Sequence, residues 1–272
     1  ALLISGLANY FLADLMVFRK SPYIKKIKDH ILTDNVQADI LNEEKLIERT
    51  LKQFTKEVRA RYNLEIIVSD GGSKDSTLAI AGKYADRVVD YKEKYSQNIS
   101  QGRNAGAKFS QRDVLIFLNA DVTIDDPDHL ISRSVEAIRE KKCSAIACRV
   151  EVHEAERKFS DVLFHGFYNR YVSFLNKVYI GMGRGECHIM SREAFDKAGG
   201  YNEKLAAGED FDLYNRLRKT GKVEYRNDFL VYESPRRYRK YGYARIILDW
   251  NKNAYSVFFL NRSISKSWDP VR

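Results

Sequence analysis

Cysteine and proline are scarce in this 272-residue sequence, which contains three cysteines and four prolines. Cys143, Cys148 and Cys187 are odd in number and lack the spacing of a metal site, which argues against a disulfide framework and favours reduced thiols in a cytoplasmic setting. The sequence also lacks a proline-rich linker, an internal repeat and a low-complexity tract. One compact domain is therefore the simplest organisation.

Uninterrupted apolar runs are lacking too. Residues 1–18 are mostly apolar, but Asn9 and Asp14 interrupt them, and an acidic side chain within a membrane span is costly. Arg19 and Lys20 begin a basic flank, which would keep the following domain cytoplasmic if the segment entered a bilayer. Two interpretations stay open: a packed or swapped helix, or peripheral contact with the cytoplasmic face of a membrane.

Acidic residues are outnumbered, with 37 Asp and Glu against 46 Lys and Arg, for a formal net charge of +9. This excess suits an anionic partner such as nucleic acid, anionic lipid or a phosphate-bearing ligand, or it keeps the surface solvated. Hydrophobic residues make up 44% and charged residues 31%, which is ordinary for a soluble globular protein.

Short apolar runs alternate with helical patterns from residue 36 onward, which predicts a Rossmann-like α/β domain with a mostly parallel sheet flanked by helices. Strands are predicted at residues 64–69, 87–90, 114–118, 145–150, 187–190 and 229–232. Helices are predicted after an N-cap at Asn42, after the loop at 70–73, at Pro127 after the N-cap Asp126, after the N-cap Ser191, and from residue 209 to Gly221. The α/β domain is expected to span residues 35–240, between an N-terminal apolar and basic helical segment (1–34) and a C-terminal amphipathic helical segment (241–272).

The C-terminal segment carries one apolar stripe at helical spacing: Tyr243, Ile247, Trp250, Ala254 and Val257. Core packing explains such a stripe. Flanking cations would equally let the helix rest on a membrane or on a second subunit, so a homodimer stays open.

Acidic residues follow several of the predicted strands. Ligands of open α/β sheets bind at the carboxyl ends of strands, and Asp70 ends one of them. Asp70 is either a helix cap or a group that hydrogen-bonds the base or ribose of a nucleotide. Gly71 and Gly72 would let the backbone approach that nucleotide closely.

Asp121 follows the most apolar strand, with Asn119 as a second oxygen ligand beside it. This arrangement suits Mg²⁺ or Mn²⁺ bridging a diphosphate, although the tripeptide alone is a weak signal. The glycine-bearing segment at residues 101–106 contains Arg103 and is either a phosphate-binding helix start or an ordinary turn and cap.

Glu209 and Asp210 lie at a predicted helix N-terminus, where acids complement the helix dipole. Transfer with inversion also needs a base, and Asp210 could accept the proton of an attacking hydroxyl. Arg236 and Arg237 follow the last strand and would clamp a diphosphate, or belong to a solvated or lipid-facing basic loop.

Taken in order, these segments resemble family 2 glycosyltransferases of the GT-A fold over residues 36–240. The resemblance is carried by Asn42-Glu43-Glu44, IIVSDGGSKDST (66–77), GRNAGA (102–107), FLNADV (117–122) and, most specifically, residues 185–213 with the Glu-Asp pair. It implies an inverting, metal-assisted transfer of a hexose from a nucleotide diphosphate sugar to a hydroxyl of a glycan or lipid-linked acceptor, with no role for nucleic acid.

By that resemblance Asn42 and Glu43 would bind the nucleotide, and Asp70 would contact its base. Asp121 would be the metal-binding second aspartate of the Asp-x-Asp motif, and Asp210 would be the catalytic base. Asn119 replaces the first aspartate, and Glu233 stands near the position of a metal-ligating histidine, so the third protein ligand is open. Residues 36–41 depart from the apolar first strand of the family.

Two other functions remain as alternatives. A sugar-nucleotide nucleotidyltransferase would need a phosphate-cradling loop after its first strand, where this chain has the acidic, glycine-free residues 42–47. A nucleic-acid-binding module would place cations along one face, whereas here acids follow the strands.

Overall fold

The computed structural model describes residues 15–16, 35–40, 42–90, 98–110, 112–260 and 262–264. At residues 15–16, 35–40, 251, 258 and 259 it describes the backbone alone. The strands are β1 (Leu15–Met16), β2 (Asn35–Ile40), β3 (Ile66–Asp70), β4 (Arg87–Asp90), β5 (Val114–Leu118), β6 (Thr123–Ile124), β7 (Cys143–Val152), β8 (Cys187–Ser191) and β9 (Lys222–Glu233). The helices are α1 (Ile47–Lys52), α2 (Lys56–Tyr62), α3 (Thr77–Ala81), α4 (Ile99–Phe109), α5 (Pro127–Val135), the π-helical turn η1 (Glu136–Glu140), α6 (Phe159–Lys177), α7 (Arg192–Ala198), α8 (Glu209–Thr220), α9 (Arg236–Tyr241) and α10 (Tyr243–Leu260).

These strands form one mixed sheet in the order β1-β3-β2-β5-β8-β7-β9-β6, and β4 pairs with β3. β2, β3, β4 and β5 are parallel; β8 runs against β5 and β7, and β9 is parallel to β7. Among the described residues, six strands therefore share a direction: β2, β3, β4, β5, β7 and β9. Their carboxyl ends lie at one edge of the sheet, as the sequence predicted for a ligand site.

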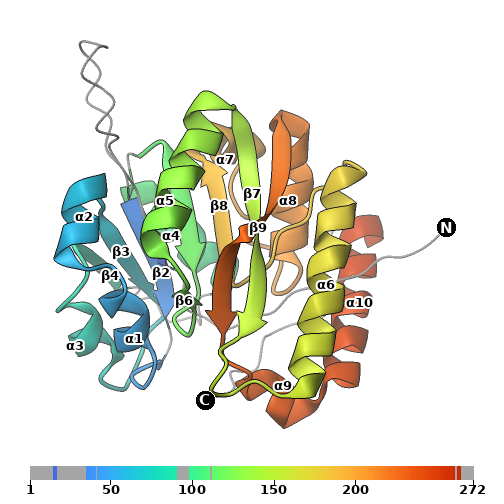
Figure 1. The fold of residues 1–272 in the computed structure, drawn as a ribbon, viewed down its shortest axis with the longest axis horizontal. Helices are drawn as coiled ribbons and strands as arrows, with labels where there is room; N and C mark the ends of the chain where they lie inside the picture. Colours follow the sequence, from blue (N-terminus) through green and yellow to red (C-terminus); the bar gives the residue numbers. More distant parts are fainter. Residues whose placement is uncertain are drawn as a thin grey trace.

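The centre of the sheet is apolar because helices cover both of its faces (Figure 1). All five residues of β5 are buried, as expected for a strand whose two faces are both covered. α5 begins as predicted, with Pro127 in the first turn and the Asp126 side chain accepting from the His129 amide. α8 likewise ends at Gly221. The predicted architecture of one sheet between helices is confirmed.

The predicted single helix after Asn42 is wrong, because the chain forms two short helices with a break between them. α1 ends at Lys52, and Thr55 then caps α2 by accepting from the Val58 amide. Asn42 has a φ of 54° and is not a helix cap. Thr50 explains the fixed position of α1, since its hydroxyl donates to the Ala120 carbonyl beside the end of β5.

The N-terminal segment was expected to be helical throughout residues 1–34. Leu15–Met16 instead form β1, which pairs antiparallel with β3, so the helical expectation is wrong at these two positions. The rest of that segment up to residue 34 lies outside the described residues, as do residues 265–272 of the C-terminal segment.

α10 lies where the C-terminal amphipathic helix was predicted, and it packs with its neighbours through large side chains. Trp250, Ala254 and Val257 are buried, whereas Ile247 is 40% exposed and Ile246 takes its place in the core. Figure 1 shows α6 and α10 side by side at the edge of the molecule, and the ring of Phe164 on α6 lies 5.8 Å from that of Trp250. No helix in the described part of the chain is long and apolar enough to cross a bilayer.

Candidate active site

Acidic side chains gather at the carboxyl edge of the sheet because five chain segments bring them there. Glu43 follows β2, Asp121 follows β5 and Glu233 ends β9. Glu186 precedes β8, the strand that enters the sheet from this edge, and Asp210 lies in the first turn of α8. All five are at least nine-tenths buried. Their charges must therefore be compensated by nearby cations or hydrogen-bond donors.

The loop after β3 is organised by Asp70. The Asp70 carboxylate accepts from the amides of Gly72 and Ser73, each at 2.8 Å, and from the Ser73 hydroxyl. Asp70 has no exposed surface, and burial raises its pKa despite these donors. In this conformation the Asp70 oxygens hold the loop, and a direct contact of Asp70 with a base stays a prediction.

The turn after β3 depends on the backbone conformation of Gly72. Gly72 has a φ of +99°, a backbone conformation that residues other than glycine rarely adopt. The space around it is open, since a Cβ at this position would meet no protein atom within 4 Å. The turn therefore requires glycine at position 72, and the close approach of a nucleotide stays a prediction. Gly71 is half-buried beside it.

Asn42 and Glu43 tie the end of β2 to the same loop. The Asn42 amide donates to the Ser73 hydroxyl at 2.8 Å, and the Asn42 side chain accepts from the Lys74 amide at 2.6 Å. The Glu43 amide donates to the Thr77 hydroxyl at 2.8 Å. The predicted nucleotide-binding residues Asn42, Glu43 and Asp70 thus form one continuous network.

Arg236 connects this network to Asp121. Its Nη2 lies 3.2 Å from Glu43 Oε2 and 3.1 Å from Asp121 Oδ2. Burial raises the pKa of Asp121, and the Arg236 guanidinium opposes that increase. The structure therefore places a cation between two of the predicted site acids, and that cation comes from α9.

A second buried cation, Arg184, neutralises Glu186, for which no role was predicted, and Glu233, which stands near the position of a metal-ligating histidine in the family. Arg184 donates to Glu186 and to Glu233, both at 3.2 Å from Nη2, while the Tyr238 hydroxyl donates to Glu233 at 3.0 Å. The imidazole of His165 lies 3.6 Å from Glu233. Burial raises the pKa of Glu233, and the charge of Glu186 adds to the increase.

Asp210 lies at the amino end of α8, where Gly208 with a φ of +81° begins the helix. The Asp210 carboxylate accepts from the Phe211 amide at 2.7 Å. Burial raises its pKa to about 6, with the Glu186 charge adding to the increase and Arg103 opposing it. A carboxylate with a pKa near neutrality suits general base catalysis.

Arg103 does not occupy a helix start, as predicted, but lies inside α4 with no exposed surface. Its guanidinium donates to Glu209 at 3.0 Å, to Asn119 Oδ1 at 3.3 Å and to the Gly185 carbonyl at 3.0 Å. In this conformation Arg103 joins the segments that carry Asp121, Glu186 and Asp210, and its contact with a phosphate stays a prediction. Asn119, predicted as a ribose or metal ligand, is 3% exposed and accepts from Arg103.

Arg237, the second predicted diphosphate clamp, is half-buried, and its guanidinium lies 5.3 Å from the centre of the Tyr241 ring. Arg237 thus contacts an aromatic ring, whereas Arg236 contacts the carboxylates of Glu43 and Asp121. Its role toward a ligand stays a prediction.

With this geometry in view, comparison with known proteins identifies the family. The model of glycosyl transferase family 2 matches residues 39–199, more than half of the chain. The chain belongs to this family. The match begins at β2 and ends after α7, so it includes the strand ends that carry Glu43, Asp70, Asp121 and Glu186.

Among curated proteins, a validoxylamine A glucosyltransferase of Streptomyces hygroscopicus subsp. limoneus is 29% identical over 96 residues, which cover 34% of this chain and 21% of that protein. The chain thus matches about a fifth of the length of this relative. The corresponding protein of S. hygroscopicus subsp. jinggangensis is 29% identical over 96 residues, 34% of this chain and 23% of its own.

Solved structures share the fold at low sequence identity. The mannosyltransferase PcManGT from Pyrobaculum calidifontis, in complex with GDP-Man and Mn²⁺, has a TM-score of 0.56 and 19% identity over 71% of this chain and 54% of its own. S. aureus TarS 1–349 in complex with UDP-GlcNAc has a TM-score of 0.55 and 18% identity over 71% of this chain and 56% of its own. The prediction of a family 2 glycosyltransferase with the GT-A fold is confirmed.

Proposed function

We propose that the carboxyl edge of this sheet binds a nucleotide diphosphate sugar and that Asp210 deprotonates an acceptor hydroxyl, which then attacks the sugar with inversion. The observation that carries the proposal is the joining of Asp121 and Asp210 in one buried cluster, through Glu186 and through Arg103 with Asn119. Family membership supports the sugar transfer. The sugar nucleotides bound in PcManGT and TarS support the class of donor.

A divalent cation fits beside Asp121. The guanidinium of Arg236 lies against Asp121 and Glu43, and this contact supports a position that accepts positive charge. The described residues contain no group of three or more His, Cys, Asp or Glu side chains able to hold a metal by themselves. Mg²⁺ and Mn²⁺ do not need such a group, because substrate phosphates and water complete their coordination. Asp121 would hold the ion, which would act as a Lewis acid on the departing diphosphate.

Residues of the chain accept the proton, orient the base and position the donor. The bond from the acceptor oxygen to the anomeric carbon forms as the bond to the nucleotide diphosphate breaks, and the acceptor proton passes to Asp210. The Phe211 amide orients the Asp210 carboxylate, and Arg103 stabilises its charged form. Asn42 and Asp70 fix the loop after β3 on which we place the nucleotide.

Asp121→Ala is expected to weaken Mn²⁺-dependent binding of a nucleotide diphosphate about a hundredfold, because the ion loses its only predicted carboxylate ligand. Calorimetric titration of UDP and GDP, with Mn²⁺ and with EDTA, measures the effect. Asp125→Ala is the matched control, since Asp125 is an exposed acid four residues away that accepts from the Tyr232 hydroxyl. Equal Mn²⁺-dependent affinities for the wild type and Asp121→Ala would contradict the metal site.

Transfer is expected to depend on pH through Asp210. Only the ionised carboxylate accepts a proton, and its pKa is raised to about 6. kcat/KM should therefore be nearly constant well above pH 6 and fall about tenfold for each pH unit below it. Initial rates at saturating Mn²⁺ measure the profile. A profile that stays flat from pH 7 down to about pH 4.5 would exclude a base with this pKa.

A further inference from the structure

α6 carries a large apolar surface that faces outward. Phe159 is 76% exposed, Phe167 69% and Leu163 58%. Together with Val162, Phe174 and Val178, which are also exposed, these side chains form what we call the α6 stripe. Contiguous apolar surface of this kind marks an interaction site in a soluble protein.

The opposite side of α6 packs against the core and against α10. Phe164, Tyr168 and Val172 are buried, and the rings of Phe164 and Tyr168 lie within 6 Å of Trp250 on α10. The stripe recurs at spacings of four, four, seven and four residues from Phe159 to Val178, and so stays on one face of the helix. The core therefore does not need the α6 stripe.

The exposed charges along α6 itself have one sign. Asp161 is the only acidic residue of α6, and it is buried, where Arg239 and the Tyr243 hydroxyl bind it. The exposed polar residues at and along the helix are Lys158, Ser160, Arg170 and Lys177. The outer face of α6 is thus apolar and cationic, with no exposed carboxylate.

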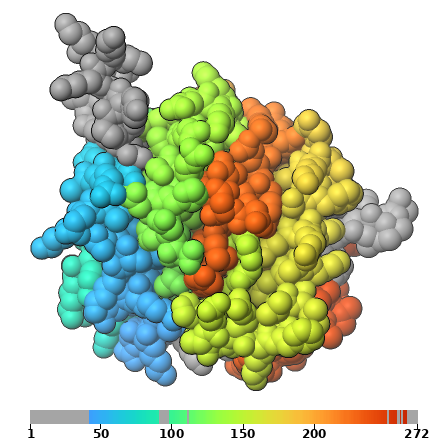
Figure 2. All heavy atoms as spheres, in the orientation of Figure 1, coloured from blue at the N-terminus to red at the C-terminus, as the bar shows by residue number. Residues whose placement is uncertain are grey.

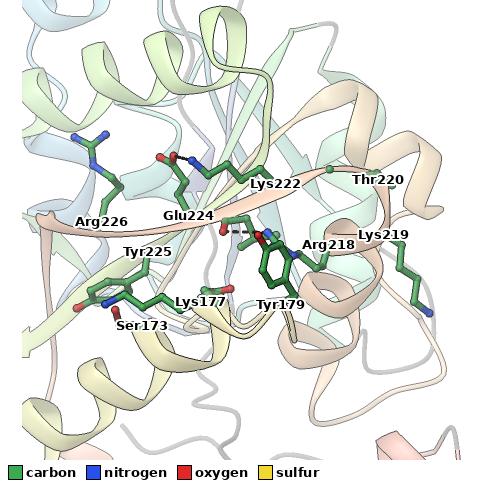
Figure 3. Close-up of a pocket in the computed structure, with 13 residues that line it drawn as sticks. Ser173, Lys177, Tyr179, Arg218, Lys219, Thr220, Lys222, Glu224, Tyr225 and Arg226 are labelled. Carbon is green, nitrogen blue, oxygen red and sulfur yellow. Dashed lines mark hydrogen bonds and ion pairs between the residues drawn. The ribbon is translucent and has the colours of Figure 1, made fainter.

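A cavity of about 820 Å³ opens beside the C-terminal end of the stripe (Figure 3). Its cationic lining comes from Lys177, Arg218, Lys219, Lys222 and Arg226. Glu224 is the only acid of the lining, and Lys222 binds it. This cavity lies at the start of β9, the end opposite Glu233, so it is separate from the candidate active site. Its charge suits the phosphate of a lipid headgroup.

We propose that the α6 stripe and this cationic cavity dock the protein on an anionic lipid bilayer. The apolar side chains would enter the boundary between headgroups and acyl chains, while Lys177 and its neighbours would contact lipid phosphates. Charge complementarity selects this occupant. A second copy would bring the same cationic face against itself, and the N-terminal segment is also basic, with Arg19 and Lys20.

Docking through α6 would place the amino end of this helix, which lies next to α9, at the lipid surface. The amino end of α6 is held by Arg239 of α9, the short helix that also supplies Arg236 to Glu43 and Asp121. In Figure 2 the outer surface of α6, in yellow, continues into the chain that precedes it toward the lower edge of the molecule. The docking surface does not depend on the proposed transfer chemistry.

Flotation of the full chain with vesicles tests the docking surface. The wild type is expected to bind vesicles of phosphatidylcholine and phosphatidylglycerol more tightly than vesicles of phosphatidylcholine alone. Phe167→Asp should weaken binding to both about tenfold or more, because a charge replaces an inserted aromatic ring. Lys177→Ala should weaken binding to the anionic vesicles only, by about fivefold.

Phe109→Asp is the matched control, since Phe109 is an aromatic residue of α4 that is 46% exposed and lies away from α6. It should bind vesicles like the wild type. Failure of the wild type to bind anionic vesicles would overturn the proposal, as would equal binding by Phe167→Asp. Light scattering that shows a dimer dissociated by Phe167→Asp would assign the stripe to self-association instead. Since none of these measurements uses catalysis, their failure is distinguishable from failure of the transfer chemistry.

Discussion

Asp210→Asn is expected to lower kcat about a thousandfold and to leave the affinity for the nucleotide diphosphate sugar within about twofold of the wild type. The amide cannot accept the proton of the acceptor hydroxyl. It can still accept from the Phe211 amide, so the amino end of α8 should keep its conformation. Single-turnover rates measure the first quantity, and calorimetric titration of the donor measures the second.

Asp212→Asn is the matched control for Asp210→Asn. Asp212 lies in the same first turn of α8, and its carboxylate binds Arg216 rather than the buried cluster. Its loss should change kcat by less than about threefold, as for a partly exposed ion pair. If Asp210→Asn weakened donor binding with no specific effect on turnover, the assignment of the base would be wrong.

Arg103→Met is expected to destabilise the fold by about 3–5 kcal/mol, because it leaves the Glu209 carboxylate buried without its cation. The substitution also removes the donors to Asn119 and to the Gly185 carbonyl. Urea denaturation measures the loss. Arg61→Met is the control, since the pair of Arg61 with Asp128 is exposed and contributes about 0–1 kcal/mol.

The double variant Arg103→Met with Glu209→Gln should recover part of the lost stability, because no unpaired charge then remains at that site. A second consequence concerns Asp210, whose pKa is held down by Arg103. Over the pH range in which the Arg103→Met protein remains folded, the fall in kcat/KM should move to higher pH. Unchanged stability together with an unchanged pH profile would show that Arg103 does not link the site.

The candidate site was partly predictable because strand ends are visible in a sequence. Asp70 and Asp121 follow apolar runs, and parallel strands bring such ends to one edge of the sheet. Asp210 was recognisable as an acid at a helix N-terminus. Glu186 carries no comparable signal beyond its place before the apolar run that forms β8, so no role was predicted for it, although its charge acts on Asp121, Glu233 and Asp210.

The partners of buried cations could not be predicted. Arg103 in a glycine-bearing segment resembles a phosphate ligand, but α4 continues through that segment and turns the side chain toward Glu209, more than a hundred residues away. Arg236 was likewise predicted as a diphosphate clamp, and in the structure its guanidinium lies between Glu43 and Asp121. Both contacts join residues distant in sequence.

The sequence by itself determined the family, the alternation of strands and helices, and the acids that end the strands, because apolar periodicity and helix caps are local properties of the chain. Only the tertiary structure decided which cation neutralises each acid, which face of α10 enters the core and that α6 keeps an apolar face outside. These features depend on which surfaces packing covers, and a buried charge takes as its partner whatever group the fold brings within reach.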